Sequence, residues 1–78
     1  MTLADMKPGQ KGRIHSVDAS KAAVVRLMVL GLVEDVQVQI ENIAIGGDPI
    51  EISVYGSSVS LRRQDARLFE VSLDETNG

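Results

Sequence analysis

The spacing of apolar and polar residues changes along this chain, and its clearest stretches predict strands. Apolar and polar residues alternate one by one over residues 36–41 and again over residues 50–55. This alternation is typical of strands with one buried face and one solvent-exposed face. The intervening Gly46-Gly47-Asp48-Pro49 is rich in turn formers. The two strands are therefore predicted to form a hairpin.

A helical period precedes this hairpin. Residues 21–30 contain few polar side chains, and Asp18 or Ser20 is expected to cap the helix at its start, with Gly31 as its stop. The spacing predicts a core-facing side made of Ala23, Val24, Leu27, Met28 and Leu30.

The rest of the chain alternates between turn signals and short apolar segments. The turn formers are Lys7-Pro8-Gly9 and Gly56-Ser57-Ser58. The segments between and after them are predicted to be a first strand (12–17), a short strand (59–61), a single helical turn (62–66) and a last strand (68–73).

These elements predict a mainly β fold. We expect a small, closed or nearly closed barrel of about five strands, with one short helix inserted after the first strand and a helical turn before the last. The length of 78 residues is that of one domain, which we place at residues 1–73. Residues 74–78 have little to bury and are expected to be a disordered tail. Formation of a homo-oligomer through an exposed barrel edge stays open.

Composition excludes several classes of protein. The chain has no cysteine, so it has no disulfide, thiolate metal site or thiol nucleophile. The net charge of −3 argues against binding nucleic acid by phosphate neutralisation. No apolar run approaches the roughly 20 residues of a membrane span, and the first ten residues lack the layout of a signal peptide. We expect a cytoplasmic protein that does not itself span a membrane.

Charge is unevenly distributed. Residues 1–31 carry five basic and two acidic side chains, whereas residues 32–60 carry five acidic and no basic ones. Such a dipolar surface suits docking onto a charged protein partner, although a chance distribution is equally compatible with so short a chain.

Candidate catalytic and metal-binding residues are few. His15 is the single histidine, and the chain contains no Gly-x-Ser-x-Gly turn, no phosphate-binding loop and no calcium loop. We therefore predict that the protein is not an enzyme. The carboxylates of Glu34, Asp35 and Asp48, with His15, are weak candidates for a divalent metal site. Solvated turn charges are the favoured interpretation of these carboxylates.

Candidate partner-binding residues lie on the predicted helix and on the helical turn. The helix is more apolar than a one-faced surface helix requires, which makes Val25 and Val29, with Arg26 between them, candidates for a docking surface. Arg62 and Arg63 belong to a basic cluster that could bind a carboxylate or phosphate. Internal pairing with a neighbouring aspartate is an equally open interpretation of that cluster.

Several short motifs, taken in order, resemble the ferrous iron transport protein A family (FeoA), whose members have an SH3-like barrel. The resemblance covers about residues 3–71. The motifs that carry it are Leu3-Ala4-Asp5-Met6-Lys7-Pro8-Gly9, Gly12-Arg13-Ile14, Arg26-Leu27, Leu30-Gly31-Leu32, Gly47-Asp48-Pro49-Ile50, Val54-Tyr55-Gly56, Val59-Ser60-Leu61-Arg62-Arg63-Gln64-Asp65-Ala66 and Phe69-Glu70-Val71.

The resemblance implies a non-catalytic accessory module of ferrous iron uptake, without a cofactor of its own, that binds the cytoplasmic part of a membrane ferrous iron transporter. The chain also resembles the C-terminal module of metal-dependent repressors of the diphtheria toxin repressor kind. This second resemblance implies an alternative function, that of a direct carrier or sensor of a divalent metal, which would bind Fe²⁺ or another such ion weakly. One departure stands out. The family usually has Pro-Gly where this chain has Glu34-Asp35.

Overall fold

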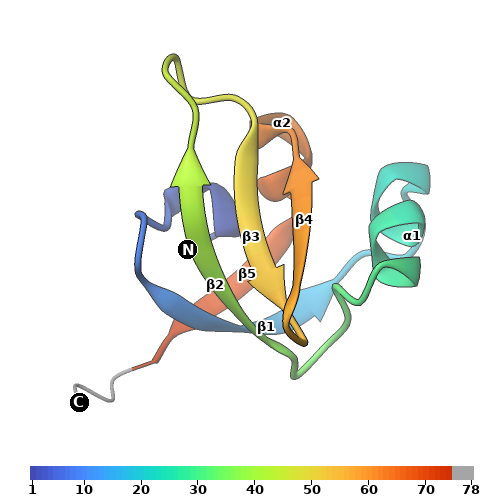
Figure 1. The fold of residues 1–78 in the computed structure, drawn as a ribbon. Helices are drawn as coiled ribbons and strands as arrows, with labels where there is room; N and C mark the ends of the chain where they lie inside the picture. The colour runs from blue at the N-terminus through green and yellow to red at the C-terminus, as the bar shows by residue number, and fades with distance from the viewer. Residues whose placement is uncertain (75–78) are drawn as a thin grey trace.

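The computed structural model describes residues 1–74 and consists of one antiparallel sheet, two short α-helices and a 3-10 turn (Figure 1). Asp74 is the one residue of the predicted tail that lies within this range, and residues 75–78 lie outside it. The elements, in chain order, are η1 (Leu3–Asp5), β1 (Lys11–Val17), α1 (Ala22–Val29), β2 (Gln37–Ile43), β3 (Ile50–Val54), β4 (Ser57–Leu61), α2 (Arg63–Ala66) and β5 (Phe69–Leu73).

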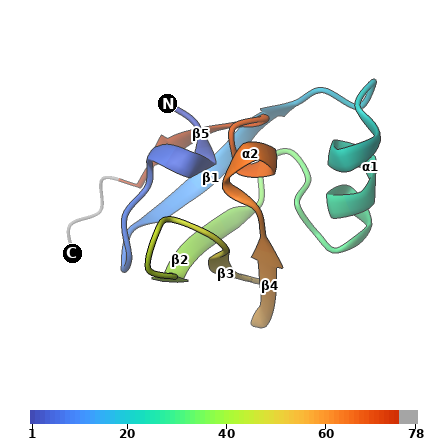
Figure 2. The same ribbon diagram turned by 90° about the horizontal axis from the view of Figure 1, so that it is seen from above.

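The five strands are ordered β4-β3-β2-β1-β5. Figures 1 and 2 show β1 and β5 crossing the direction of β2, β3 and β4, so the sheet curls around one core. Two register shifts accompany this curl, between Ile14 and Ser16 and between Ile40 and Asn42, and such bulges bend strands. Within residues 1–74, β4 and β5 do not pair. The barrel is therefore open at one seam, and η1 and α2 pack against each other at one end of it (Figure 2).

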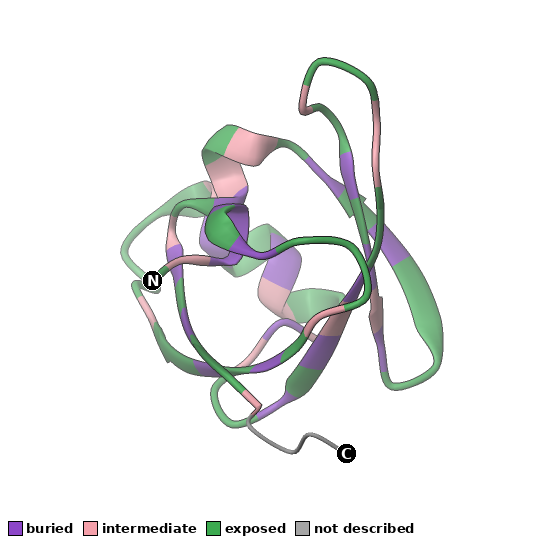
Figure 3. Cartoon of the chain, turned by 90° about the vertical axis from the view of Figure 1, so that its left-hand side faces the viewer, coloured by how far each residue is buried: buried purple, intermediate pink, exposed green. Residues whose placement is uncertain are grey.

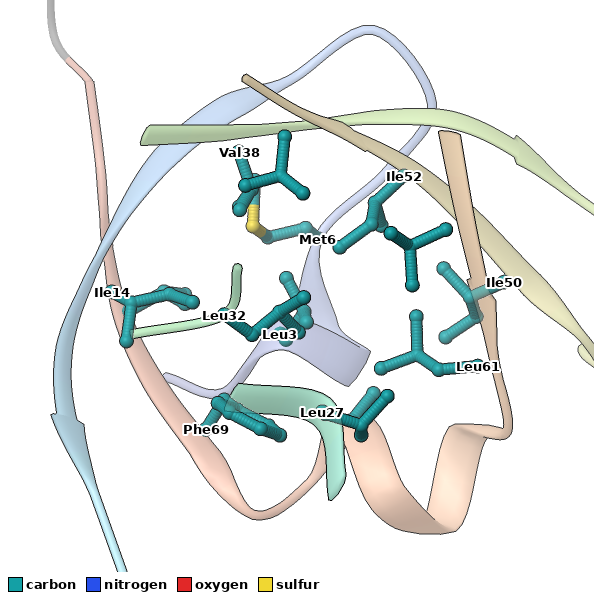
Figure 4. Packing of buried hydrophobic residues seen from close by; sticks show 14 of the residues in the cluster. Leu3, Met6, Ile14, Leu27, Leu32, Val38, Ile50, Ile52, Leu61 and Phe69 are labelled. Carbon is teal, nitrogen blue, oxygen red and sulfur yellow. The ribbon is translucent and has the colours of Figure 1, made fainter. Parts of the chain in front are cut away.

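The core is aliphatic apart from Phe69 and contains no buried polar or charged residue among those described. The predicted alternation is confirmed, because Val38 and Ile40 of β2 and Ile52 of β3 are buried whereas Gln37 and Glu41 are exposed. Figure 3 shows this alternation as buried and exposed segments that follow one another along the strands. The side chains of Leu3, Met6 and Leu32 fill the centre (Figure 4).

The β3–β4 hairpin corrects the predicted turn at residues 56–58. Val54 pairs with Ser57, so the turn consists of Tyr55 and Gly56, which have φ angles of 52° and 79°. Positive φ at both positions is the requirement of the two-residue turn that matches strand twist. The strand therefore begins at Ser57, two residues before the predicted start at Val59.

Helix α1 confirms the predicted stop at Gly31 but differs from expectation at its start. Neither Asp18 nor Ser20 caps it, because the Asp18 carboxylate accepts hydrogen bonds from the N–H and hydroxyl of Ser20 (3.1 and 2.6 Å). Both bonds hold the pKa of Asp18 below its usual value, and the bond from the Ser20 hydroxyl has the larger effect. At the other end Leu30 is the C-cap and Gly31 follows it with a φ of 113°, as predicted, but Leu30, predicted to be buried, is 55% exposed. The helix contacts the core through Val24 and Leu27.

The N-terminal segment forms η1, which the sequence pattern did not indicate. The Asp5 carboxylate accepts a hydrogen bond from the backbone N–H of Thr2 (2.8 Å), and this bond is the main cause that lowers the pKa of Asp5. The segment also runs along β5, where Thr2 bridges to Glu70 and the Val71 N–H donates to the Met1 carbonyl (3.0 Å). No helix among residues 1–74 is long and apolar enough to cross a membrane.

Candidate functional site

A groove of about 550 Å³ lies between α1 and the corner where β4 meets α2. Three elements and one loop form it, so it brings together parts of the chain that are far apart in sequence. Its lining residues are Arg26 and Leu27 of α1 with Leu30 at the helix C-cap, Asp48 and Pro49 of the β2–β3 loop, and Ser60, Leu61, Arg62 and Asp65 of the β4–α2 corner. We call this set of residues the α1–β4 groove.

Two of the predicted partner-binding residues lie on opposite walls of this groove. Arg26 belongs to α1 and Arg62 to the β4–α2 corner, and both are exposed. The one ion pair within the described part of the chain joins the N-terminal ammonium group to Glu70 (3.8 Å). Both guanidinium groups therefore keep their donors for a partner, and a guanidinium binds a carboxylate through paired hydrogen bonds.

Arg63, the neighbouring candidate, is occupied within the molecule. Its Nε donates to the Gly47 carbonyl (3.1 Å) and its Nη1 to the Ala4 carbonyl (2.8 Å). The side chain thus joins the β2–β3 loop to the N-terminal segment through α2. Gly47 has φ of 96°, and a Cβ at this position would lie 3.1 Å from the Arg63 Nε, so the contact depends on glycine. Arg63 does not line the groove, and its hydrogen bond to Gly47 holds the loop that carries the lining residues Asp48 and Pro49.

Asp48 has a structural contact of its own. Its Oδ1 accepts a hydrogen bond from the backbone N–H of Arg63 (2.6 Å), the first residue of α2. A carboxylate at a helix N-terminus satisfies a free N–H and interacts favourably with the helix dipole. This loop residue therefore caps a helix that has no side-chain cap from its own N-cap position.

The apolar candidates on α1 lie outside the groove. Val25 is 46% exposed and Val29 82% exposed, and neither lines the α1–β4 groove. They are separated by one helical turn and so share a face of α1. If they contact a partner, this partner must cover the outer face of the helix as well as the groove.

The predicted metal candidates do not gather into one site. Residues 1–74 contain no group of three or more histidine or acidic side chains that could hold a metal ion. His15, Glu34 and Asp35 are exposed, and the Asp35 N–H donates to the Ile14 carbonyl (2.7 Å), next to His15. Asp48 belongs to the loop beside α2, as described above.

Sequence reasoning did not find the apolar part of the groove. Leu30 was expected in the core, and Pro49 and Leu61 were interpreted as parts of a turn and of a strand. The one available signal was the segment 57–61, Ser-Ser-Val-Ser-Leu, which is a strand without any charged residue. That this strand and α1 line the same groove depends on the tertiary fold.

The chain was compared with known proteins. Its sequence matches the model of the FeoA domain over residues 1–73. No curated protein matches the chain. Among solved structures, the iron(II) transport protein A of Clostridium thermocellum is 30% identical with a TM-score of 0.87, over 94% of this chain and 45% of that one. This chain thus spans less than half the length of that relative.

Two further solved structures of FeoA proteins are similar to this chain. The FeoA protein of Chlorobium tepidum is 35% identical with a TM-score of 0.86, over 99% of this chain and 76% of that one. The FeoA of Stenotrophomonas maltophilia, solved with zinc and described as a prokaryotic SH3 domain protein, is 28% identical with a TM-score of 0.81, over 92% and 89% of the two chains.

The fold is also shared with a protein described as a manganese-dependent transcriptional repressor, which has a TM-score of 0.85 at 14% identity, over 95% of this chain and 36% of that one. The IdeR protein of T. acidophilum has a TM-score of 0.82 at 20% identity, over 95% of this chain and 34% of that one. This likeness shows the fold alone. Together with the five-stranded curled sheet, the comparisons confirm the predicted SH3-like fold and the predicted family. This chain belongs to the FeoA family.

Proposed function

We propose that this chain is a non-catalytic accessory module of ferrous iron uptake, which binds the cytoplasmic part of a membrane ferrous iron transporter. Family membership supports the link to iron transport. The S. maltophilia relative is itself described as a candidate activating factor of bacterial ferrous iron transport. Such a role requires the protein to be in the cytoplasm.

The α1–β4 groove is the observation that carries the docking part of this proposal. It is open, partly apolar and flanked by Arg26 and Arg62, neither of which is in an ion pair within residues 1–74. Apolar area supplies binding free energy, while the guanidinium groups supply orientation and specificity. The exposed Val25 and Val29 extend the same docking surface along α1.

The test is a calorimetric titration of the purified protein against the cytoplasmic part of the candidate transporter. We expect binding by the parent protein and a loss of about tenfold or more in Arg26→Glu and Arg62→Glu. Arg67→Glu is the matched control, because Arg67 is exposed at the C-terminal end of α2 and does not line the groove. Unchanged binding in both groove variants, or an equal loss in the control, would refute docking through the groove.

The alternative function is that of a direct divalent-metal carrier or sensor that uses His15, Glu34, Asp35 and Asp48. The zinc-containing S. maltophilia FeoA is the observation in its favour. Against it, the described residues do not bring three such ligands together, and a stable site for these ions needs about four ligands or more. Titration of the protein alone with Fe²⁺ and Zn²⁺ distinguishes the two functions. Stoichiometric metal binding without transporter binding would establish the carrier.

A further inference from the structure

Strand β4 has a free edge. It is the last strand on its side of the sheet, and it pairs with β3 in a regular register from Val54↔Ser57 to Ile50↔Leu61. The residues that flank a two-residue hairpin turn form a hydrogen-bonded pair, and such pairs alternate along the ladder. Val59 and Leu61 therefore direct their backbone groups towards β3. Ser58 and Ser60 direct theirs outwards.

The opposite edge of the sheet is covered. Along β5, the N-terminal segment supplies the Thr2↔Glu70 bridge and the hydrogen bond from the Val71 N–H to the Met1 carbonyl. No segment within residues 1–74 pairs with the outer edge of β4 in this way. The strand also lacks the features that usually protect an edge, since it contains no charged residue and no proline and has no bulge against β3. Of the two edges, β4 is the one open to pairing.

The free edge borders the α1–β4 groove. Ser60 and Leu61 of β4 form one wall of the groove, and Leu27 of α1 and Leu30 at the helix C-cap lie on the other. Figures 1 and 2 show α1 beside β4 on the side that carries no further strand. An extended segment that paired with Ser58 and Ser60 would therefore bury alternate side chains against these leucines. Its neighbouring residues would meet Arg26 and Arg62.

We propose that β4 accepts one extended segment of the transporter's cytoplasmic part as a sixth strand of the sheet. This segment carries an apolar side chain that enters the groove and a carboxylate that binds Arg26 or Arg62. The inference rests on the proposed function and specifies its binding mode. In this mode backbone hydrogen bonds supply affinity, and the groove selects among segments through their alternate side chains.

A single extended segment fits this place better than a second copy of the protein does. A second copy that paired through its own β4 would bring its β3 as the next strand outwards. Helix α1 stands on that side of β4 (Figure 1), so it would obstruct this additional strand. The two unpaired guanidinium groups also favour an acidic partner over a second copy, whose β4 has no carboxylate.

The test replaces the backbone donor at the edge. Ser60→Pro removes the outward N–H of Ser60 without removing a hydrogen bond to β3, and proline is tolerated at such edge positions. Its control is Ala22→Pro, at the first residue of α1, where proline is also tolerated and which does not line the groove. In calorimetry against the transporter's cytoplasmic part, we expect binding at least about tenfold weaker for Ser60→Pro and unchanged binding for Ala22→Pro.

Hydrogen exchange on the unaltered protein gives a second readout, which decides the question even if Ser60→Pro does not fold. By NMR, we expect the amides of Ser58 and Ser60 to exchange at least about tenfold more slowly in the complex than in the free protein. If a complex forms but these amides are not protected, or if Ser60→Pro binds like the parent, strand addition is wrong and the proposed function stands. If the parent protein forms no complex, the proposed function fails and the inference with it.

Discussion

Asp35 shows how one residue adapts to a turn that the family usually builds with glycine. Its φ is 70°, which lies in the left-handed region that favours glycine. The backbone is fixed there by two contacts, from the Asp35 N–H to the Ile14 carbonyl (2.7 Å) and from the Arg13 Nη1 to the Asp35 carbonyl (2.6 Å). Aspartate tolerates this region better than most residues. The turn is therefore made without Pro-Gly, at a cost in backbone strain.

Asp35→Gly is accordingly expected to stabilise the protein. The left-handed conformation costs an L-residue roughly 1–2 kcal/mol, whereas glycine loses only about 0.5–1 kcal/mol in additional chain entropy. We expect the free energy of unfolding to rise by about 0.5 kcal/mol, measured by urea denaturation. Glu34→Ala, an exposed neighbour, is the control and should change stability by less than about 0.5 kcal/mol. A less stable Asp35→Gly protein would show that the aspartate side chain contributes more than its conformation costs.

Arg63 contributes to stability through its two side-chain hydrogen bonds. Arg63→Met keeps an unbranched side chain but removes the donors to the carbonyls of Ala4 and Gly47. Because hydrogen bonds from charged donors are stronger than neutral ones, and because this side chain is half-buried, we expect a loss of about 2 kcal/mol in the free energy of unfolding. Arg67→Met should change it by less than about 0.5 kcal/mol. Equal effects of the two substitutions in thermal or urea unfolding would contradict a structural role for Arg63.

At the scale of elements, the sequence predicted those whose signal is local. The alternation over residues 36–41 and 50–55 identified β2 and β3, because a strand with one buried face repeats every two residues. The start of β4 was missed because Tyr55, with φ of 52°, is an unexpected residue in a two-residue turn. The end of α1 was predicted from Gly31, whereas the exposure of Leu30 was missed because helical spacing does not show where the core ends. The conformation of Tyr55 and the exposure of Leu30 both depend on tertiary contacts.

The groove was beyond prediction for a related reason. Arg26 and Arg62 are 36 positions apart in the sequence. No local pattern indicates that they line one groove together with Leu30 and Leu61. Arg63 appeared equivalent to Arg62 in sequence, yet it is used inside the molecule. Adjacent residues on a helical turn point in different directions, and only the fold decides which one reaches solvent.

Helix α1 is expected to open more easily than the sheet. It is eight residues long, lacks a side-chain N-cap and contributes only Val24 and Leu27 as buried residues. Figure 4 shows Leu27 between Phe69 and Leu61, so the helix is held to the core by this residue together with Val24. Short helices depend on such packing. By NMR, we expect hydrogen exchange of α1 amides to be faster than that of β2 and β3 by about tenfold or more. Equal protection would show that α1 unfolds only with the whole domain.

At the scale of the whole molecule, the proposed docking surface lies on one side of the protein. The N-terminal segment closes one edge of the sheet, whereas the other edge, that of β4, borders the groove, and α1 lies beside it (Figure 2). The two guanidinium groups of this side belong to a chain with a net charge of −3. A partner that approaches this side therefore meets two guanidinium groups with the carboxylates of Asp48 and Asp65 between the same walls, and this pattern of opposite charges favours one orientation.

This arrangement predicts that docking weakens as salt is added. Arg26 and Arg62 are exposed, and charges on a surface are screened over about 10 Å at 0.1 M ionic strength but over about 3 Å at 1 M. We expect the Kd for the transporter's cytoplasmic part to rise several-fold between 0.05 and 0.5 M salt. The double variant Arg26→Gln and Arg62→Gln should bind more weakly at low salt and depend less on salt. A Kd that stays constant or falls with salt would mean that the apolar groove, and not the arginines, orients the partner.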